Sequence, residues 1–220
     1  MNLIDKLKEF EKDINKIHSE EDLQKIFYND LAPAFLYGGY IDVRGDFKVY
    51  IKTVEFYFHS ETPDGIHDPI VYHRNGRDLE EAPYFPLMSI HAHSSGFDIT
   101  FESKIKKYRA SALIRSYEII DTRDKGNEKY LKWKSGNNKF VKSDDYDFNT
   151  QSTYLKAVLN GFAFKNDNDI IWEDVPRVKT MDLKVKTRQN VLKSKNDFVY
   201  DKIIGEKCTR NWSFTREEKI

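Results

Sequence analysis

The chain has 220 residues, of which 39% are hydrophobic and 33% are charged, so it can form a full hydrophobic core and lacks the composition of a disordered protein. Its formal net charge of zero gives no overall field to attract nucleic acid or acidic lipid, and its single cysteine, Cys208, excludes an intrachain disulfide and a cysteine-based zinc site. The first residues lack the apolar stretch of a signal peptide and no run is long enough to cross a membrane, so we expect a cytoplasmic protein without a membrane partner.

The N-terminal segment, residues 1–28, carries two helical patterns. Apolar residues recur every three or four positions from Leu3 to Ile17, which predicts an amphipathic helix. Ser19 is followed by three acidic residues, and this pattern is typical of an N-cap and first turn of a second, shorter helix. Pro33 and the glycine pair at 38–39 then indicate a change from helices to strands.

Most of the remaining chain has the alternating pattern of β-strands. Strands are predicted at residues 40–43, 47–58, 88–93, 97–102, 109–120, 170–173 and 181–185. Arg44-Gly45-Asp46 predicts the turn between the first two strands, residues 122–148 have the composition of an exposed loop, and residues 150–161 have a helical pattern. Helices that flank several mostly antiparallel strands indicate a single α+β domain over residues 1–220.

Glu55 is the most unusual residue of the strand predicted at 47–58. Side chains two positions apart share a face, so strict alternation places Glu55 with Val49 and Ile51. A carboxylate on an apolar face costs free energy unless it is paired, hydrated or chemically useful. The alternative is that the buried face shifts along the strand, because Val54 and Phe56 have the opposite phase. Glu55 is therefore a candidate functional residue.

Three other polar side chains are candidates to act with Glu55. Tyr57 follows on the same strand, His67 lies in the next polar loop, and Arg115 shares a strand phase with Leu113. A glutamate beside an arginine can hold and activate a water molecule, and a tyrosine and a histidine can frame a flat substrate. The alternative is an ion pair between Glu55 and Arg115 that only joins two strands.

The order of these residues resembles that of the alkylpurine (3-methyladenine) DNA glycosylase family, from about residue 22 to the end of the chain. The segments that carry the resemblance are Thr53-Val54-Glu55-Phe56-Tyr57, Asp64-Gly65-Ile66-His67, Ala112-Leu113-Ile114-Arg115, residues 153–161, Ile171-Trp172-Glu173-Asp174, Arg188 and Trp212-Ser213-Phe214.

The resemblance implies a curved, mostly antiparallel sheet flanked by helices, as in the C-terminal domain of formyltransferases. It also implies base excision repair of DNA, in which a damaged purine is flipped out of the duplex and its N-glycosidic bond is hydrolysed without a metal or cofactor. Glu55 would be the general base that orients the attacking water, and Arg115 would hold that water or the DNA backbone. Tyr57 and His67 would contact the flipped base.

The chain departs from the family pattern at two places. The family has a tyrosine-rich strand and turn where this chain has Ile90-His91-Ala92-His93, and Glu102 or its neighbour replaces an asparagine at the pocket floor. We assign His91, His93 and Glu102 as further substrate contacts. The missing tyrosines support an alternative, a catalytically inactive relative that binds a nucleotide, nucleic acid or protein partner through the same pocket.

Two local patterns bear on a metal and on DNA. His91 and His93 lie on one face of a strand and could ligate a metal with a third ligand from the preceding loop, which leaves a metal-dependent hydrolase as a further alternative, although we assign no metal ligand. Residues 179–220 contain eleven Lys and Arg against six Asp and Glu, so positive charge that could contact phosphates gathers near the C-terminus.

Overall fold

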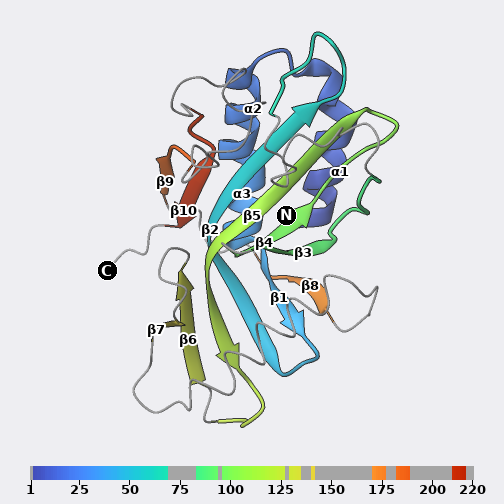
Figure 1. Ribbon diagram of the computed structural model, residues 1–220. Helices are drawn as coiled ribbons and strands as arrows, with labels where there is room; N and C mark the ends of the chain where they lie inside the picture. Colours follow the sequence, from blue (N-terminus) through green and yellow to red (C-terminus); the bar gives the residue numbers. More distant parts are fainter. Residues whose placement is uncertain are drawn as a thin grey trace.

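The structure is a computed structural model and describes residues 2–68, 83–93, 96–126, 129–134, 140–141, 170–176, 182–188 and 210–216. These residues form an α+β fold in which N-terminal helices pack against one face of an antiparallel sheet (Figure 1). The predicted α+β class with an antiparallel sheet is therefore confirmed. The helix predicted at residues 150–161 lies outside the described residues.

The helices are α1 (Leu3–Asp13), the 3₁₀ turn Ile14–Lys16, α2 (Glu20–Ile26), the π-helical turn Phe27–Leu31 and α3 (Ala32–Tyr37). The predicted N-cap is confirmed, because the Ser19 hydroxyl accepts a hydrogen bond from the backbone N–H of Asp22. Pro33 does not end the helical region as predicted; it lies in the first turn of α3, where a missing N–H costs nothing. No helix in the described part of the chain is long and apolar enough to cross a membrane.

The strands are β1 (Gly39–Val43), β2 (Phe47–Ser60), β3 (Ile90–His93), β4 (Gly96–Thr100), β5 (Tyr108–Asp121), β6 (Lys129–Lys134), β7 (Phe140–Val141), β8 (Ile170–Asp174), β9 (Leu183–Lys186) and β10 (Ser213–Arg216). The sheet order is β3-β4-β5-β2-β1-β8, with β10 between β2 and β9, and β6 between β5 and β7. The region predicted as a loop at residues 122–148 thus contains β6, which extends the sheet beside β5.

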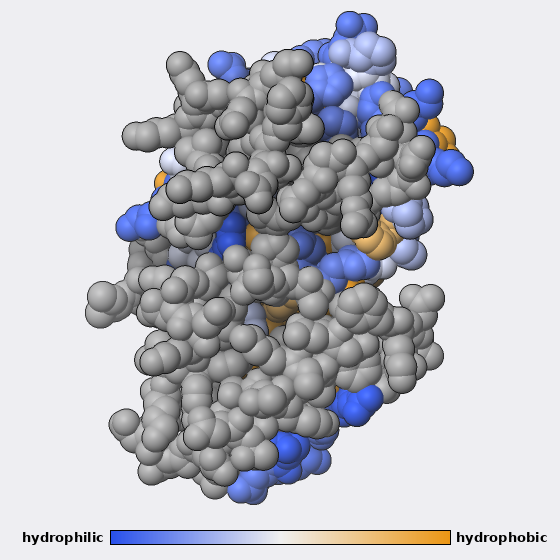
Figure 2. Space-filling view, in the orientation of Figure 1, coloured by the Kyte–Doolittle hydropathy of each residue, from blue (hydrophilic) through white to orange (hydrophobic). Residues whose placement is uncertain are grey.

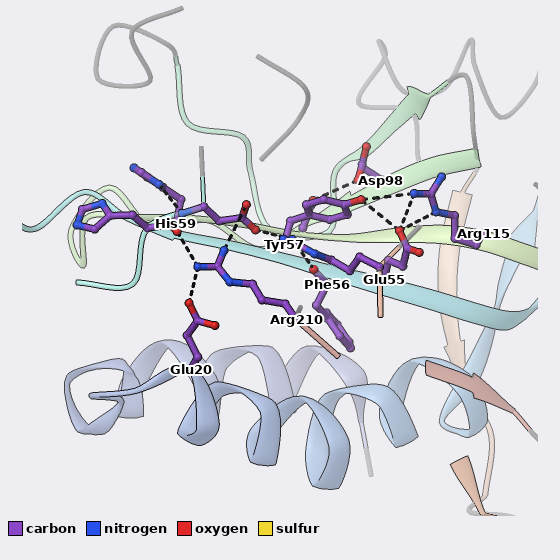
Figure 3. Close-up of polar contacts among 12 residues, drawn as sticks. Glu20, Glu55, Phe56, Tyr57, His59, Asp98, Arg115 and Arg210 are labelled. Carbon is purple, nitrogen blue, oxygen red and sulfur yellow. Dashed lines mark hydrogen bonds and ion pairs between the residues drawn. The ribbon is translucent and has the colours of Figure 1, made fainter. Parts of the chain in front are cut away.

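The face of β2 that meets the helices is aromatic. Phe56 stacks on Phe27 with ring centroids 4.5 Å apart, and Phe58 meets Phe10 edge to face at 6.1 Å. All four rings are at most 3% exposed. In the close-up of Figure 3, Phe56 points toward the helices. Burial of these large rings supplies much of the stabilisation of the fold.

The apolar phase of β2 changes in the middle of the strand. Its core residues are Phe47, Val49 and Ile51 in the first half but Val54, Phe56 and Phe58 in the second half. The pairing with β5 is irregular at this point, around Thr53, and both long strands bend near their middle (Figure 1). Strict alternation therefore misplaced Glu55: it lies opposite to the apolar residues of its own half of the strand.

Hydropathy varies along the molecule in the same view. Figure 2 shows hydrophilic residues at both ends of the molecule, and hydrophobic residues, with further hydrophilic ones beside them, in the middle. The core cluster links the helices to both halves of the long strands, so the described helices and strands share one hydrophobic core.

Replacement of Phe27 by alanine tests this core. Phe27 is fully buried, so Phe27→Ala is expected to lower the free energy of unfolding by about 3–5 kcal/mol. Its neighbour Tyr28 is 42% exposed, and Tyr28→Ala is expected to cost about 1 kcal/mol or less. Urea unfolding of both variants measures the difference, and equal losses would contradict the assigned packing.

Candidate functional site

The face of the sheet away from the helices carries a row of mostly polar residues that crosses six strands. Directly paired residues on antiparallel strands point to the same face, and neighbouring strands lie about 4.8 Å apart. The row consists of His91 (β3), Asp98 (β4), Leu113 (β5), Glu55 (β2), Ser213 (β10) and Lys186 (β9). The sheet thus places residues from distant parts of the chain side by side on one surface.

Glu55 is held in this row by Arg115 and Tyr57. The Arg115 Nε and Nη2 atoms donate hydrogen bonds to Glu55 Oε2 at 2.8 and 2.6 Å, and the Tyr57 hydroxyl donates to the same oxygen at 3.2 Å (Figure 3). Glu55 is 1% exposed and Arg115 is 6% exposed. A buried carboxylate needs such a partner, because removal of an ion from water costs several kcal/mol. The structure brings these three predicted site residues together, and their catalytic roles stay predictions.

Asp98 is a second carboxyl on this face, which the sequence analysis missed. It is 5% exposed, and its Oδ1 accepts a hydrogen bond from the Ser111 hydroxyl at 3.1 Å. Burial raises the pKa of Asp98 to about 7; the hydrogen bond from Ser111 and the charge of Arg115 oppose this shift, and the charge of Glu55 adds to it. In the sequence, Asp98 alternates with Phe97 and Ile99 and looks like an outward-facing polar residue, so only its register with β5 reveals it.

Tyr57 connects the Glu55 cluster to the C-terminal segment. Burial, with a contribution from the charge of Glu55, raises the pKa of Tyr57 well above its ordinary value, so its hydroxyl stays a hydrogen-bond donor. The Arg188 guanidinium lies 4.6 Å from the centroid of the Tyr57 ring and forms an ion pair with Asp68 at 2.5 Å. Arg188, one of the residues that carry the resemblance, therefore packs against the residue that holds Glu55.

His67 lies at the surface, and the structure does not bring it to Glu55. Its ring Nε2 is 3.2 Å from the Pro63 carbonyl oxygen, and its own carbonyl accepts a hydrogen bond from Arg210 at 2.9 Å. The more buried histidine is His59, whose Nδ1 accepts a hydrogen bond from the backbone N–H of Asp68 at 3.0 Å. Burial lowers the pKa of His59 to about 4, so this ring is neutral at pH 7.

Glu102 lies between β4 and β5 and belongs to a second polar cluster, around Arg109 on β5. Its side chain is fully buried and accepts hydrogen bonds from the Phe85 N–H at 2.6 Å and from Arg109 Nη1 at 3.5 Å. Arg109 also forms an ion pair with Glu61 at 2.7 Å. Arg109 and Arg115 lie six residues apart on β5. Glu102 contacts Arg109 and Glu55 contacts Arg115, so Glu102 lies toward the end of the polar face that is remote from Glu55.

Two histidines on β3 were predicted to contact the substrate, and the structure describes the side chain of His91 but not that of His93. His91 is paired with Asp98 in the polar row, and its ring centroid is 3.9 Å from that of Phe85. His93 lies on β3, and its side chain is outside the description. No group of three or more His, Cys, Asp or Glu residues in the described ranges is arranged to hold a metal ion.

No family model, curated protein or solved structure matches the chain. The fold and the site define it as an α+β protein whose sheet holds two buried carboxyls, Asp98 and Glu55, in one row, with Arg115 bonded to Glu55.

The pKa of Asp98 predicts how Asp98→Asn changes stability with pH. Between pH of about 4 and about 7, folded Asp98 holds a proton that the unfolded chain has released, so this group makes the wild type less stable as pH rises. The stability of Asp98→Asn relative to wild type is therefore expected to increase through this window, by up to about 4 kcal/mol. Urea unfolding at pH 4, 5.5, 7 and 8 measures it.

Asp121→Asn is a matched control, since Asp121 is a buried carboxyl on β5 that pairs with Arg123. Loss of this paired carboxylate is not expected to produce a rising relative stability. A constant difference between Asp98→Asn and wild type across the pH range would contradict the raised pKa of Asp98.

Proposed function

We propose that the protein is a DNA glycosylase that hydrolyses the N-glycosidic bond of a modified purine, with Glu55 as the general base. One observation carries the proposal: Glu55, Tyr57 and Arg115 form one hydrogen-bonded cluster on the polar face of the sheet. These residues also carry the resemblance to the alkylpurine DNA glycosylases. The resemblance further suggests that the sheet has the fold of the formyltransferase C-terminal domain.

The cluster supports the activation of a water molecule. Arg115 and Tyr57 both hold Oε2 of Glu55, so the carboxylate has a fixed orientation. A carboxylate fixed in this way can orient a water molecule and take its proton as the water attacks the sugar carbon C1′. The site is shielded from bulk water, which strengthens electrostatic interactions with the charge that develops on the sugar.

The polar row also supplies a place for DNA phosphates. Lys186 ends the row on β9 and is exposed, as is Lys184 on the same strand. Lys186 is two strand spacings, about 10 Å, from Glu55 in the sheet. Phosphates that flank a flipped nucleotide can therefore meet positive charge close to Glu55, even though the chain has no net charge.

Base release from duplex DNA tests the proposal. Duplexes that contain 7-methylguanine or hypoxanthine are incubated with the protein, and free base is measured by chromatography. The wild type is expected to release at least one of these bases, and Glu55→Gln is expected to lower the rate by about 100-fold or more. Release that survives in Glu55→Gln, or no release by the wild type, would overturn the proposal.

Lys186→Ala tests the DNA contact. Loss of one phosphate contact is expected to weaken binding of all duplexes similarly and to reduce the slope of log K against log salt by about one. Lys8→Ala is the matched control, because Lys8 is an exposed lysine on α1, which packs on the opposite face. Fluorescence anisotropy at several salt concentrations measures both, and equal effects would contradict the placement of DNA on the polar face.

A second candidate function is binding without hydrolysis, as in an inactive relative that holds a nucleotide, nucleic acid or protein partner on this face. The observation that favours it is the exposure of only 1% at Glu55 and 5% at Asp98, which leaves little of either carboxyl open to a reacting nucleotide. Tight binding of a modified duplex with no base release would support this second function.

A further inference from the structure

We propose that Asp68 and Arg188 are positioning residues: they fix the Tyr57 ring, so that its hydroxyl holds the Glu55 carboxylate in the orientation that activates water. This inference rests on the proposed function and adds to it two residues that act through Tyr57 rather than on the substrate. The pair that they form is a second buried ion pair, which lies beside Tyr57 and is separate from the pair between Glu55 and Arg115.

Arg188 contacts the segment of β2 that carries both site residues. Its guanidinium lies 4.6 Å from the centroid of the Tyr57 ring, and its Nη1 atom donates a hydrogen bond to the Phe56 carbonyl oxygen at 3.3 Å. Phe56 is the residue between Glu55 and Tyr57. The attraction of a guanidinium for an aromatic ring is strongest where water is excluded, and the Arg188 side chain is fully buried. Arg188 therefore restrains the Tyr57 ring and the backbone beside it at the same time.

Asp68 determines where the Arg188 guanidinium lies. Its Oδ2 atom accepts a hydrogen bond from Arg188 Nη1 at 2.5 Å, and both side chains are fully buried. A buried guanidinium needs a carboxylate partner, and their charge-assisted hydrogen bond fixes its orientation. Asp68 is in turn anchored to β2, because its backbone N–H donates a hydrogen bond to His59 Nδ1 at 3.0 Å. Asp68 is thus connected to Glu55 through Arg188 and Tyr57.

Two residues near the C-terminus also hold Arg188 in place. The backbone N–H of Arg188 donates a hydrogen bond to the Arg210 carbonyl oxygen at 3.2 Å, and its guanidinium lies 5.1 Å from the centroid of the Trp212 ring. The Trp212 carbonyl oxygen accepts a hydrogen bond from the backbone N–H of Phe56 at 2.9 Å. The guanidinium therefore contacts two aromatic rings, those of Tyr57 and Trp212, and side chains restrained in this way can hold a site with the precision that catalysis needs.

The outer end of this network lies at the helices. Arg210 Nη1 is 3.5 Å from Asp68 Oδ1, and Arg210 Nη2 forms an ion pair with Glu20 at 2.5 Å. Figure 3 shows Arg210 extended toward Glu20 at the start of α2. The Glu20 side chain is 49% exposed, so water screens this outer pair and it contributes little to the position of Tyr57. Glu20 is therefore a suitable control residue for the inner pair.

Arg188 also acts on the Tyr57 hydroxyl through its charge. Burial raises the pKa of Tyr57 well above its ordinary value, the charge of Glu55 adds to this rise, and the charge of Arg188 opposes it. A hydroxyl that loses its proton more easily is a stronger hydrogen-bond donor. Arg188 therefore strengthens the hydrogen bond from Tyr57 to Glu55 as well as orienting it.

A purely structural role for the pair predicts a different outcome. An ion pair that only fastens the C-terminal segment to β2 would affect the reaction rate whether or not residue 57 carries a hydroxyl. If the pair acts through that hydroxyl, Tyr57→Phe removes the connection, and a second substitution then has little further effect. A double-mutant cycle between Arg188 and Tyr57 therefore separates the two roles.

The first measurement is single-turnover release of whichever of 7-methylguanine and hypoxanthine the wild type releases, by Arg188→Lys, Tyr57→Phe and the double variant. Lysine keeps a positive charge beside Asp68 but lacks the planar guanidinium. Arg188→Lys is expected to slow release by about 10-fold in the wild type but by less than about threefold in Tyr57→Phe, with duplex affinity unchanged within about threefold. Glu20→Gln should leave the rate unchanged. No loss of rate in Arg188→Lys, or equal losses in both backgrounds, would overturn the positioning role while the proposed function stands.

The second measurement needs no DNA. Exchange of the Tyr57 hydroxyl proton with water, followed by NMR of the ring carbon that bears the hydroxyl, is expected to be about 10-fold faster in Asp68→Asn, because the hydrogen bond to Glu55 opens more often. Phe27→Ala is the control for general loss of stability, and it should accelerate exchange much less. Unchanged exchange in Asp68→Asn, or equal acceleration in Phe27→Ala, would overturn the positioning role. Release of neither base by the wild type would overturn the proposed function, and with it the catalytic role of this pair, whatever the exchange rate.

Discussion

The ion pair between Glu55 and Arg115 is the constraint on which the polar side of the sheet depends. It joins β2 and β5, the two longest of the described strands, on the face away from the described helices. A carboxylate that is 1% exposed cannot be left without a compensating charge, because the penalty would be a large part of the stability of a single domain. The Tyr57 hydroxyl donates a hydrogen bond to Glu55 of this pair, and the Arg188 guanidinium packs over the Tyr57 ring.

The sheet separates two kinds of burial. Toward the helices, Val54 and Phe56 lie among aromatic and aliphatic side chains. On the other side, neighbouring positions on the same strands carry Glu55 and Arg115. Stability comes mainly from the first face, so the second can hold groups whose burial costs free energy. Such an arrangement is typical of functional sites, where local cost is offset by the rest of the fold.

Much of the fold could be predicted because local patterns determine it. The stripe from Leu3 to Ile17, the cap at Ser19 and the alternation that predicts β2 and β5 all depend on residues close together in sequence. Two local predictions were wrong for local reasons. Pro33 is compatible with the first turn of a helix, and the alternation of Leu131 and Trp133 in β6 was obscured by the polar residues around it.

The site was harder to predict because it depends on register between distant strands. Glu55 and Arg115 were found because a charged residue is unusual on the apolar phase of a strand, and Tyr57 was found because it follows Glu55 on the same strand. The phase change near Thr53, however, placed Glu55 on a different face from the one predicted. Asp98 gave no signal in the sequence, since an acid that alternates with apolar residues is the normal pattern of a strand with one face in water. Its burial follows from pairing with β5, which no local pattern reveals.

Titration of the Asp98 side chain by carboxyl ¹³C NMR tests most directly whether Asp98, Glu55 and Arg115 form one electrostatically coupled site. The structure predicts a midpoint at a pH of about 7 in the wild type. It also predicts a lower midpoint in Glu55→Gln, because the negative charge that helps to hold the proton on Asp98 is then gone. An ordinary midpoint near pH 4, or a raised midpoint that Glu55→Gln leaves unchanged, would contradict this account of the site.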